Sequence, residues 1–198
     1  MPTALFDLPA PVNPPRKLWT RSDFDELYAT GWLDRHRVEL VEGELIDKMG
    51  KKRPHVNSLT LLQGWLQAVF GVLRVNPEAP IDVAPEDNPT NEPEPDLIVL
   101  KRDLSHFTQG NPRPEDLHLV IEVADSTLGF DLTTKAALYA RAGVPEYWVL
   151  DVTGRRLIVH RDPRAGRYVS VAAYAEEESV APLAAPESFL RVRDAFPG

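Results

Sequence analysis

The stretch "LVIEVADSTLGFDLTTKAALYARAG", residues 119–143, joins an apolar strand pattern to a helix pattern through a short turn. Residues 116–124 form a nearly continuous apolar run, which is typical of a strand that is covered on both faces and lies inside a sheet. A helix is expected from about Asp131 to Ala142, with Gly143 and Pro145 ending it. A strand that leads into a helix in this way indicates an α/β domain.

Glu122 is the residue that does not fit this apolar strand. Alternation puts it on the same face as Val120, and an ionised carboxylate on such a face is costly unless a cation or a metal compensates it. A second acid, Asp96, opens the neighbouring strand pattern "DLIVL", residues 96–100. The sequence therefore predicts a partner for Glu122. Asp96, the acid on the neighbouring strand, is a candidate member of the same site.

Lys135 follows Glu122 by 13 positions and lies on the predicted helix. Asp131, Lys135 and Tyr139 recur every four positions and form one stripe. Two interpretations are open: an ordinary Asp131–Lys135 ion pair on a solvated face, with Asp131 no more than a helix cap, or a lysine that the turn carries back to the end of the strand. Only the second interpretation would bring Lys135 to Glu122.

The other patterns along the chain alternate between helices and strands. The expected elements are a helix capped by Ser22 and ended by Gly31, a hairpin in 36–49 about Glu42-Gly43, a helix over 54–75, a weak strand in 80–85, and strands in 145–152, 155–161 and 167–174. No repeat or domain boundary is evident. We predict a proline-rich extended arm over residues 1–17 and one α/β domain over 18–198, with a mixed central sheet flanked by helices.

Composition restricts the kinds of function. The chain has 198 residues and no cysteine, which excludes disulfides, thiolate catalysis and Cys-ligated zinc. Its net charge of −8 argues against a general phosphate-backbone binder, although basic clusters in 47–55 and 155–167 allow a local one. Neither a signal peptide nor an apolar run long enough to span a membrane is present, so we expect a cytoplasmic protein with no membrane partner.

Three segments together resemble the family of putative restriction endonucleases within the PD-(D/E)XK nuclease superfamily. They are "EPDLIVL" (94–100), "LVIEVADST" (119–127) and "FDLTTKAALYARAGVPEYWVLD" (130–151), and the likeness extends over roughly residues 37–152. The superfamily's usual lysine would stand two positions after Glu122, where this chain has Ala124. In the family that the chain resembles, the lysine has moved to the following helix, and Lys135 matches it.

The resemblance implies a restriction-endonuclease-like core and hydrolysis of phosphodiester bonds, with double-stranded DNA as the expected substrate. It implies Asp96, Glu122 and Lys135 as catalytic residues. Asp96, Glu122 and the backbone carbonyl of Val123 would bind Mg²⁺, for which Mn²⁺ can substitute, and all three are hard oxygen donors. Lys135 would orient or activate the attacking water. A homodimer is expected by analogy.

The family's opening segment adds further candidates. Glu39 and Glu44 both match recurrent acids there, and we expect one of them to complete the metal site, with Glu44 preferred; surface solubility is the alternative for each. His55, Lys51, Lys52 and Arg53 are candidate nucleic-acid-binding residues, because they cluster at a helix start where anions are favoured. For His55 the competing interpretation is an ordinary surface histidine.

Two further functions are compatible with these residues. In the first, the nuclease scaffold serves as a non-catalytic nucleic-acid-binding or assembly module, and its carboxylates are structural. In the second, the chemistry is kept but the substrate is RNA or a branched DNA. The position of Lys135 distinguishes the non-catalytic module from the nuclease, because a lysine directed into solvent would favour the module.

Overall fold

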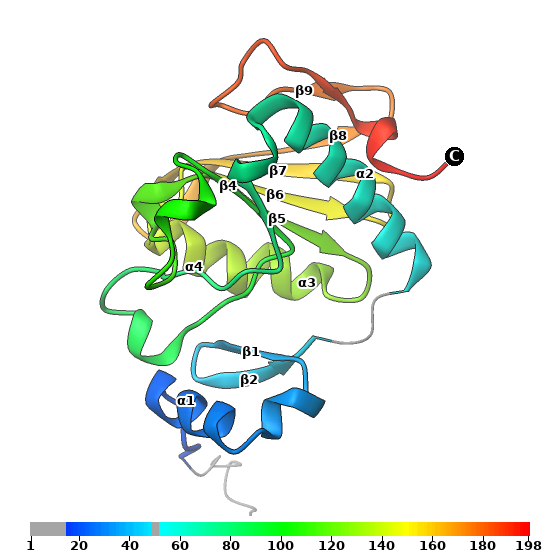
Figure 1. Cartoon of the computed structure of the whole chain (residues 1–198). Coiled ribbons are helices and arrows are strands. Elements are labelled where there is room, and N and C mark those ends of the chain that lie inside the picture. Colours follow the sequence, from blue (N-terminus) through cyan, green and yellow to red (C-terminus); the bar gives the residue numbers. More distant parts are fainter. Residues whose placement is uncertain (1–14, 49–51) are drawn as a thin grey trace, which may run out of the picture.

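The computed structural model describes residues 15–48 and 52–198, and a mixed six-stranded sheet forms its centre (Figure 1). In spatial order the strands are β3 (Val75–Pro77), β4 (Leu97–Leu100), β5 (Leu117–Ala124), β6 (Glu146–Asp151), β7 (Arg156–Arg164) and β8 (Arg167–Ala175). Only β5 and β6 pair in parallel; the other neighbours are antiparallel. The predicted mixed sheet within a single domain is confirmed.

The apolar strand β5 lies inside the sheet, as its sequence indicated. Its antiparallel register with β4 places Leu97 opposite Ile121, so the start of β4 lies beside the second half of β5. On its other side β5 runs parallel to β6, with Glu122 opposite Val149. The connection between these two parallel strands is the helical segment that carries Lys135, which is the usual crossover for parallel neighbours.

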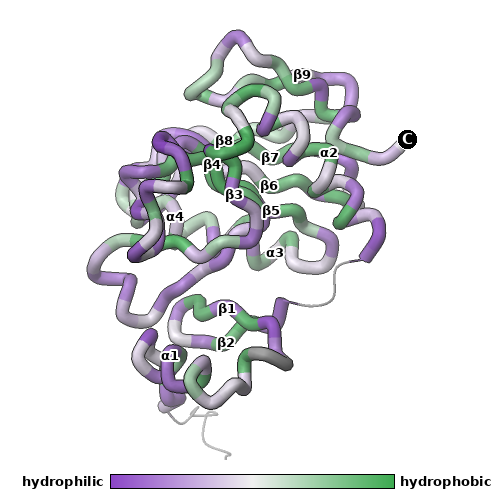
Figure 2. Tube along the Cα trace, in the orientation of Figure 1, coloured by the Kyte–Doolittle hydropathy of each residue, from purple (hydrophilic) through white to green (hydrophobic). Residues whose placement is uncertain are grey.

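Helices cover both faces of this sheet (Figure 1). On one face lies α2 (Arg53–Phe70), whose Leu62 and Leu66 pack against Ile121 and Trp148 in the larger apolar core. The other face is covered by one continuous helical segment that consists of α3 (Leu128–Phe130), a π-helical turn (Asp131–Lys135) and α4 (Ala136–Arg141). The hydropathy colouring shows the strands as the most apolar part of the chain (Figure 2).

The hairpin of β1 (Val38–Val41) and β2 (Glu44–Asp47) lies with α1 (Arg21–Ala29) below α3 and α4 (Figure 1). Its turn is at Glu42 and Gly43, as predicted, and both residues have positive φ angles of 51° and 72°. A small apolar cluster of Val41, Val83 and Leu138 joins the hairpin to α4. This contact holds the hairpin against the helix that follows β5.

Several predicted boundaries in the first half of the chain are wrong. Thr20 caps α1 through a capping box, whereas Ser22 was expected to do so. Helix α2 ends at Phe70, because Gly71 adopts a φ of 92°; of the residues expected to continue the helix, Val72–Arg74 form a 3-10 turn and Val75 begins β3. Residues 80–85 contain no strand. The first two signals are local: Thr20 and Asp23 have the spacing of a capping box, and a glycine at position 71 favours a helix end.

The helix after β5 begins at Leu128, three residues before the predicted start at Asp131, and it contains a π-helical turn that was not predicted. The short pairing of β9 (Ser179–Val180) with β10 (Leu190–Arg191) was not predicted either; a 3-10 turn, Val192–Ala195, follows it. Residues 1–14 of the proposed arm lie outside the described residues, so that arm stays a prediction. None of the described helices is both long enough and apolar enough to cross a bilayer.

Candidate active site

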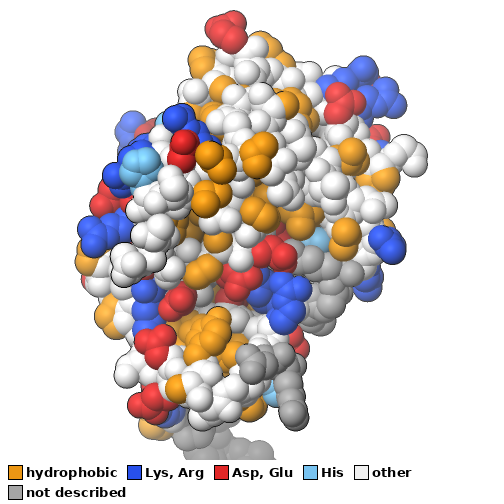
Figure 3. Space-filling view, in the orientation of Figure 1, with side chains coloured by type: hydrophobic (Ala, Val, Ile, Leu, Met, Phe, Trp, Pro, Cys, Tyr) orange, Lys and Arg blue, Asp and Glu red, His pale blue; other side chains and the backbone are white. Residues whose placement is uncertain are grey.

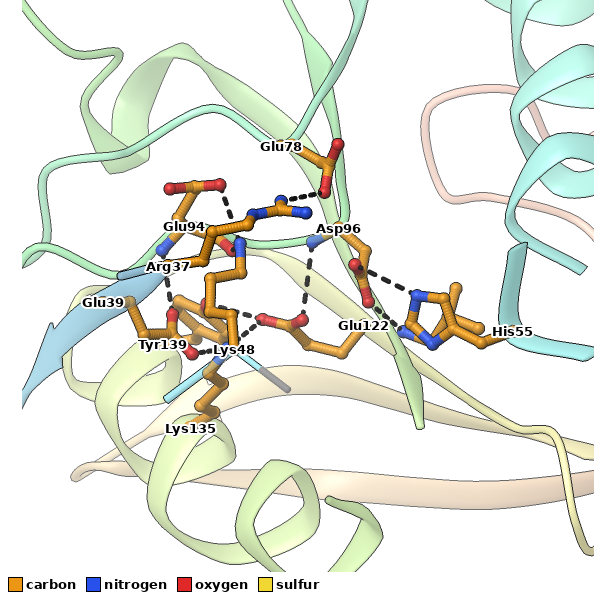
Figure 4. A network of polar contacts seen from close by, with 11 residues as sticks. Arg37, Glu39, Lys48, His55, Glu78, Glu94, Asp96, Glu122, Lys135 and Tyr139 are labelled. Atoms are coloured by element: carbon orange, nitrogen blue, oxygen red, sulfur yellow. Dashed lines mark hydrogen bonds and ion pairs between the residues drawn. The ribbon is translucent and has the colours of Figure 1, made fainter. Parts of the chain in front are cut away.

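The side chain of Lys135 is buried in the interior between the sheet and the hairpin. Its Nζ lies 2.8 Å from Oε1 of Glu122 and 2.8 Å from Oε1 of Glu39. Both Asp131 and Lys135 are only 3% exposed, so the interpretation of these two residues as a solvated surface pair is wrong. The turn after β5 does return the lysine to the strand's carboxylate, as the second interpretation required (Figure 4).

The π-helical turn contributes to this placement. In it the N–H of Ala136 reaches back five residues to the carbonyl of Asp131, so the helix holds one residue more in this turn than an α-helix would. One turn further along, the Tyr139 hydroxyl donates to Oε1 of Glu122 at 3.1 Å. Lys135 and Tyr139 therefore fix the same carboxylate oxygen from one helix.

Asp96 lies directly before β4 and meets Glu122 on the adjacent strand. Its Oδ2 accepts a hydrogen bond from the N–H of Val123 at 2.8 Å, and its own N–H donates to Oε2 of Glu122 at 3.4 Å. In a strand, the N–H and C=O of one residue point to the same side. The carbonyl of Val123 therefore faces the Asp96 side of β5, where the sequence had suggested it as a metal ligand.

The hairpin contributes Glu39 to the site. Glu39 is 4% exposed, contacts Lys135, and accepts from the N–H of Glu94 at 3.0 Å. Glu44, which the sequence had favoured, has an exposed side chain 3.5 Å from Arg16 and does not line the site. The structure thus brings Glu39, and not Glu44, to the other acids.

His55 is buried, at 8% exposure, rather than a surface residue, and its Nε2 lies 3.5 Å from Oδ1 of Asp96. Among the described residues this nitrogen has no hydrogen-bond partner. The exposed Lys52 lines the same hollow, with its Nζ 3.9 Å from Asp125. Arg53 is exposed and does not line it, and Lys51 lies outside the described residues.

These groups surround a hollow of about 360 Å³ between the hairpin and the start of the helix after β5. Acidic side chains gather in the middle of the face shown in Figure 3, next to basic side chains and above an apolar patch. The hollow is lined by Glu39, Ile46, Asp47, Lys48, Lys52, His55, Asp96, Glu122, Val123, Asp125, Ser126, Thr127, Phe130, Asp131 and Lys135. All three predicted catalytic residues thus line one space.

Burial and mutual repulsion shift the titration of the acids. Burial raises the pKa of Glu122 to about 8, although the charge of Lys135 opposes this shift. Burial likewise raises the pKa of Asp131 to about 6, against the effects of Lys135 and of the Thr127 hydroxyl, which donates to it at 2.6 Å. Burial alone would lower the pKa of Lys135, but Glu122 and the other nearby acids raise it well above its usual value.

The donor set fits a hard divalent cation. Four buried acids, Glu39, Asp96, Glu122 and Asp131, surround one buried lysine, so the hollow has an excess of negative charge and only oxygen donors from its acids. Such donors suit Mg²⁺. Within residues 15–48 and 52–198, no three acidic or histidine side chains form a ready metal cluster. The oxygen donors that the resemblance implies for such an ion are Asp96, Glu122 and the Val123 carbonyl, and the first two line the hollow side by side.

The sequence pattern placed Asp131 and Tyr139 on the lysine's stripe but gave neither a role. Both belong to the network around Glu122: Tyr139 donates to it, and Asp131 contributes charge that raises its pKa. The spacing of four residues was the available signal. Lys48 was noted only as part of the basic cluster in 47–55. It lines the hollow, and its Nζ donates to the carbonyl and the carboxylate of Glu94 at 2.9 and 2.7 Å.

The mixed sheet, with an acid before β4, a second acid in β5 and helices on both faces, is the restriction-endonuclease-like fold. A solved structure, described as "a putative nuclease belonging to DUF820 from Anabaena variabilis ATCC 29413", superposes with a TM-score of 0.66 at 17% identity, over 89% of this chain and 97% of that one. The chain belongs to the Uma2 family, described as "Putative restriction endonuclease", whose model matches residues 22–193. No curated protein matches the chain.

Proposed function

We propose that this protein is a Mg²⁺-dependent endonuclease that hydrolyses phosphodiester bonds in DNA and works in the cytoplasm. The observation that supports this most directly is the buried contact of Lys135 with Glu122, at 2.8 Å, inside a hollow that Asp96 also lines. The family description and the solved neighbour's title both name nucleases. A charged trio kept at 3–6% exposure has a large desolvation cost, which a catalytic role would explain.

In the proposed mechanism Asp96, Glu122 and the Val123 carbonyl would hold the metal, with Glu39 beside them. When bound there, such an ion would supply a lower pKa for the attacking water and charge stabilisation for the leaving oxygen. Lys135 Nζ donates hydrogen bonds toward that water and offsets the charge that develops on the phosphate. Tyr139 keeps the Glu122 carboxylate in place through its 3.1 Å hydrogen bond.

Local cations would bring the DNA backbone to this acidic protein. The net charge of −8 repels phosphates at long range, so binding depends on basic groups near the hollow. Lys52 at the rim is the first candidate, followed by Arg53 and Lys51 in the same sequence cluster. His55, whose buried Nε2 lies 3.5 Å from Asp96 without a hydrogen bond, would reach the phosphate from within the hollow.

The test is incubation of supercoiled double-stranded plasmid with the full chain and Mg²⁺ or Mn²⁺. We expect nicking or linearisation by the wild type and none by Asp96→Asn, Glu122→Gln or Lys135→Ala. Glu44→Gln is the matched control, because it removes an exposed hairpin carboxylate that does not line the hollow. Equal cleavage by all variants refutes the proposal. DNA binding that survives in every variant, without cleavage by the wild type, favours the non-catalytic module.

We also propose that the protein forms a homodimer through the free edge of β8. No strand in the described part of the chain pairs with that edge, and Val169 and Val171 on β8 are 56% and 54% exposed. A two-fold antiparallel pairing about Val171, the midpoint of the strand, would bring the Arg167 end of each copy to the Ala175 end of the other.

The absence of cysteine makes this dimer simple to test. Opposite residues on paired antiparallel strands lie about 4.5–5.5 Å apart, which permits a disulfide. Oxidised Val171→Cys should therefore run as a covalent dimer on a non-reducing gel, whereas Val72→Cys, at another surface site that is 64% exposed, should not. A protein that is monomeric by light scattering, or a dimer that Val171→Cys does not link, contradicts the interface.

A further inference from the structure

One wall of the hollow is apolar, and the proposed metal chemistry does not use it. Ile46 of β2 and Phe130, the last residue of α3, both line the space and are half-buried. Both pack against the Val41, Val83 and Leu138 cluster that joins the hairpin to α4. A phosphate group is charged and strongly hydrated, so this wall offers it nothing. The wall fits an apolar part of the substrate.

The reactive groups lie deep in this space. Asp96, Glu122 and Lys135 are 6%, 4% and 3% exposed, and they are reached through a hollow of about 360 Å³. An intact duplex carries its phosphates on the outside of a wide rod, with its bases stacked away from the protein. Such a rod cannot enter a space of this size, whereas one nucleotide of an unpaired strand can.

We propose that the hollow binds a single unpaired nucleotide, with its base against Phe130 and Ile46 and its phosphate toward Lys135. The substrate class is thus a DNA strand that is unpaired at the cleaved bond, as in single strands, bubbles or a nucleotide flipped out of a duplex. The identification of the polymer as DNA rests on the proposed function. Lys52 at the rim and the charge of Lys135 complement the phosphate, and the apolar wall complements the base.

The energetics favour an unpaired substrate. Stacking of a base on an aromatic side chain contributes about 1–3 kcal/mol, as judged by alanine substitution. Flipping a base out of a paired duplex costs a few kcal/mol, and this cost is smallest where the base is mismatched or already single-stranded. Contact with Phe130 therefore offsets part of the cost in a duplex, and in a bubble there is no such cost to offset.

The first experiment measures binding to a single-stranded oligonucleotide that carries one 2-aminopurine, in the Lys135→Ala background with Mg²⁺ so that cleavage does not interfere. We expect the fluorescence to be quenched on binding. Phe130→Leu, which keeps most of the volume but removes the ring, should weaken binding about tenfold, and Phe130→Trp should preserve it. Phe189→Leu is the matched control, because Phe189 is 64% exposed and does not line the hollow.

Unchanged binding and quenching in Phe130→Leu overturn the proposal. The second experiment compares cleavage by the wild type of a duplex and of the same duplex with a central bubble. We expect the bubble to be cut at least tenfold faster, and equal rates overturn the proposal. If neither DNA is cut, the proposed nuclease function fails, and the fluorescence result alone then decides what the hollow binds.

Discussion

Two buried glutamates lie on neighbouring strands of the same sheet, and their surroundings differ. Glu146 at the start of β6 is fully buried and receives hydrogen bonds from Arg161 at 2.8 Å, Trp148 at 2.9 Å and the N–H of Leu183 at 2.7 Å. Glu122 on β5 shares Lys135 with Glu39 and Asp131 beside a hollow that Asp96 also lines. One carboxylate is balanced by its own arginine, whereas the other belongs to a group with too few cations.

The comparison separates a buried charge with a structural role from one that supports a functional site. Glu146 and Arg161 link β6 to the chain near Ala181 and Leu183, and their hydrogen bonds account for the burial of the charge. Around Glu122 the acids outnumber the cation, and the pKa values of Glu122 and Asp131 are raised. Burial alone therefore does not mark a catalytic site. Burial with uncompensated charge next to accessible space is the combination on which the proposed site rests.

The largest expected difference between the two sites is in activity. Lys135→Ala should lower kcat/KM for plasmid cleavage by about 10²–10³-fold, because it removes a donor aimed at developing charge. Arg161→Ala should leave kcat/KM of the folded protein within about threefold, far below the loss from one catalytic donor. Steady-state kinetics on protein that circular dichroism shows to be folded would check this. A comparable loss in both variants would remove the distinction.

The same substitution should affect stability in opposite directions at the two glutamates. Glu146→Gln should lower the free energy of unfolding by about 3 kcal/mol, because Arg161 loses its charged partner in the interior. Glu122→Gln, without metal, should leave that free energy unchanged or raise it, because it reduces the excess of acids around Lys135. Urea unfolding at pH 7 measures both. A large destabilisation by Glu122→Gln would mean that its carboxylate is mainly structural.

The next largest expected difference between the two sites is in metal binding. At a Mg²⁺ concentration of 100 times Kd, the wild type should gain about 2.7 kcal/mol and melt about 5–10 °C higher. Glu122→Gln should lose this gain, and Glu146→Gln should keep it although it starts from a lower Tm. Differential scanning calorimetry with Mg²⁺ and with EDTA gives the comparison. An equal shift in both variants would place the ion elsewhere.

The smallest expected effect is the dependence of stability on pH. Burial raises the pKa of Asp131 to about 6 from 3.8, so the folded state holds a proton more tightly than the unfolded state. Stability is therefore lost as pH rises from about 4 to about 6, by about 2 kcal/mol at most. Asp131→Asn should lack that loss. Unfolding of the metal-free protein at several pH values tests this, and parallel profiles of variant and wild type would contradict it.

The sequence was sufficient where local pattern determines structure. The apolar run of β5, the turn at Glu42-Gly43 and the helix after Glu122 were all predicted. The return of Lys135 to Glu122 was one of two interpretations that the pattern left open, and the family resemblance favoured it. These features depend on periodicity and on short connections. Their success explains why one contiguous stretch contained most of the information about the site.

The features that sequence did not predict depend on packing between distant segments. Glu39 lies in the hollow, in place of Glu44, because the hairpin docks against α4 through Val41 and Leu138, which are almost a hundred residues apart in the chain. His55 is buried because the start of α2 packs beside Asp96. No local pattern contains these arrangements. The roles of all these residues in catalysis stay predictions.

The π-helical turn determines which single-residue deletions would misalign the side chains of the site. In an α-helix each residue advances by about 100° around the axis, so removal of one residue rotates everything after it by that angle. The π-helical turn already holds one residue more than that geometry needs, so deletion of Thr133 or Thr134 would convert it into an α-helical turn and leave α4 in the same phase, with Tyr139 still directed at Glu122. Deletion of one residue from α4 before Tyr139, such as Ala137, would instead turn Tyr139 away from Glu122. The helix therefore carries a phase as well as a set of residues, and its π-helical turn is the place where a residue can be lost without losing that phase.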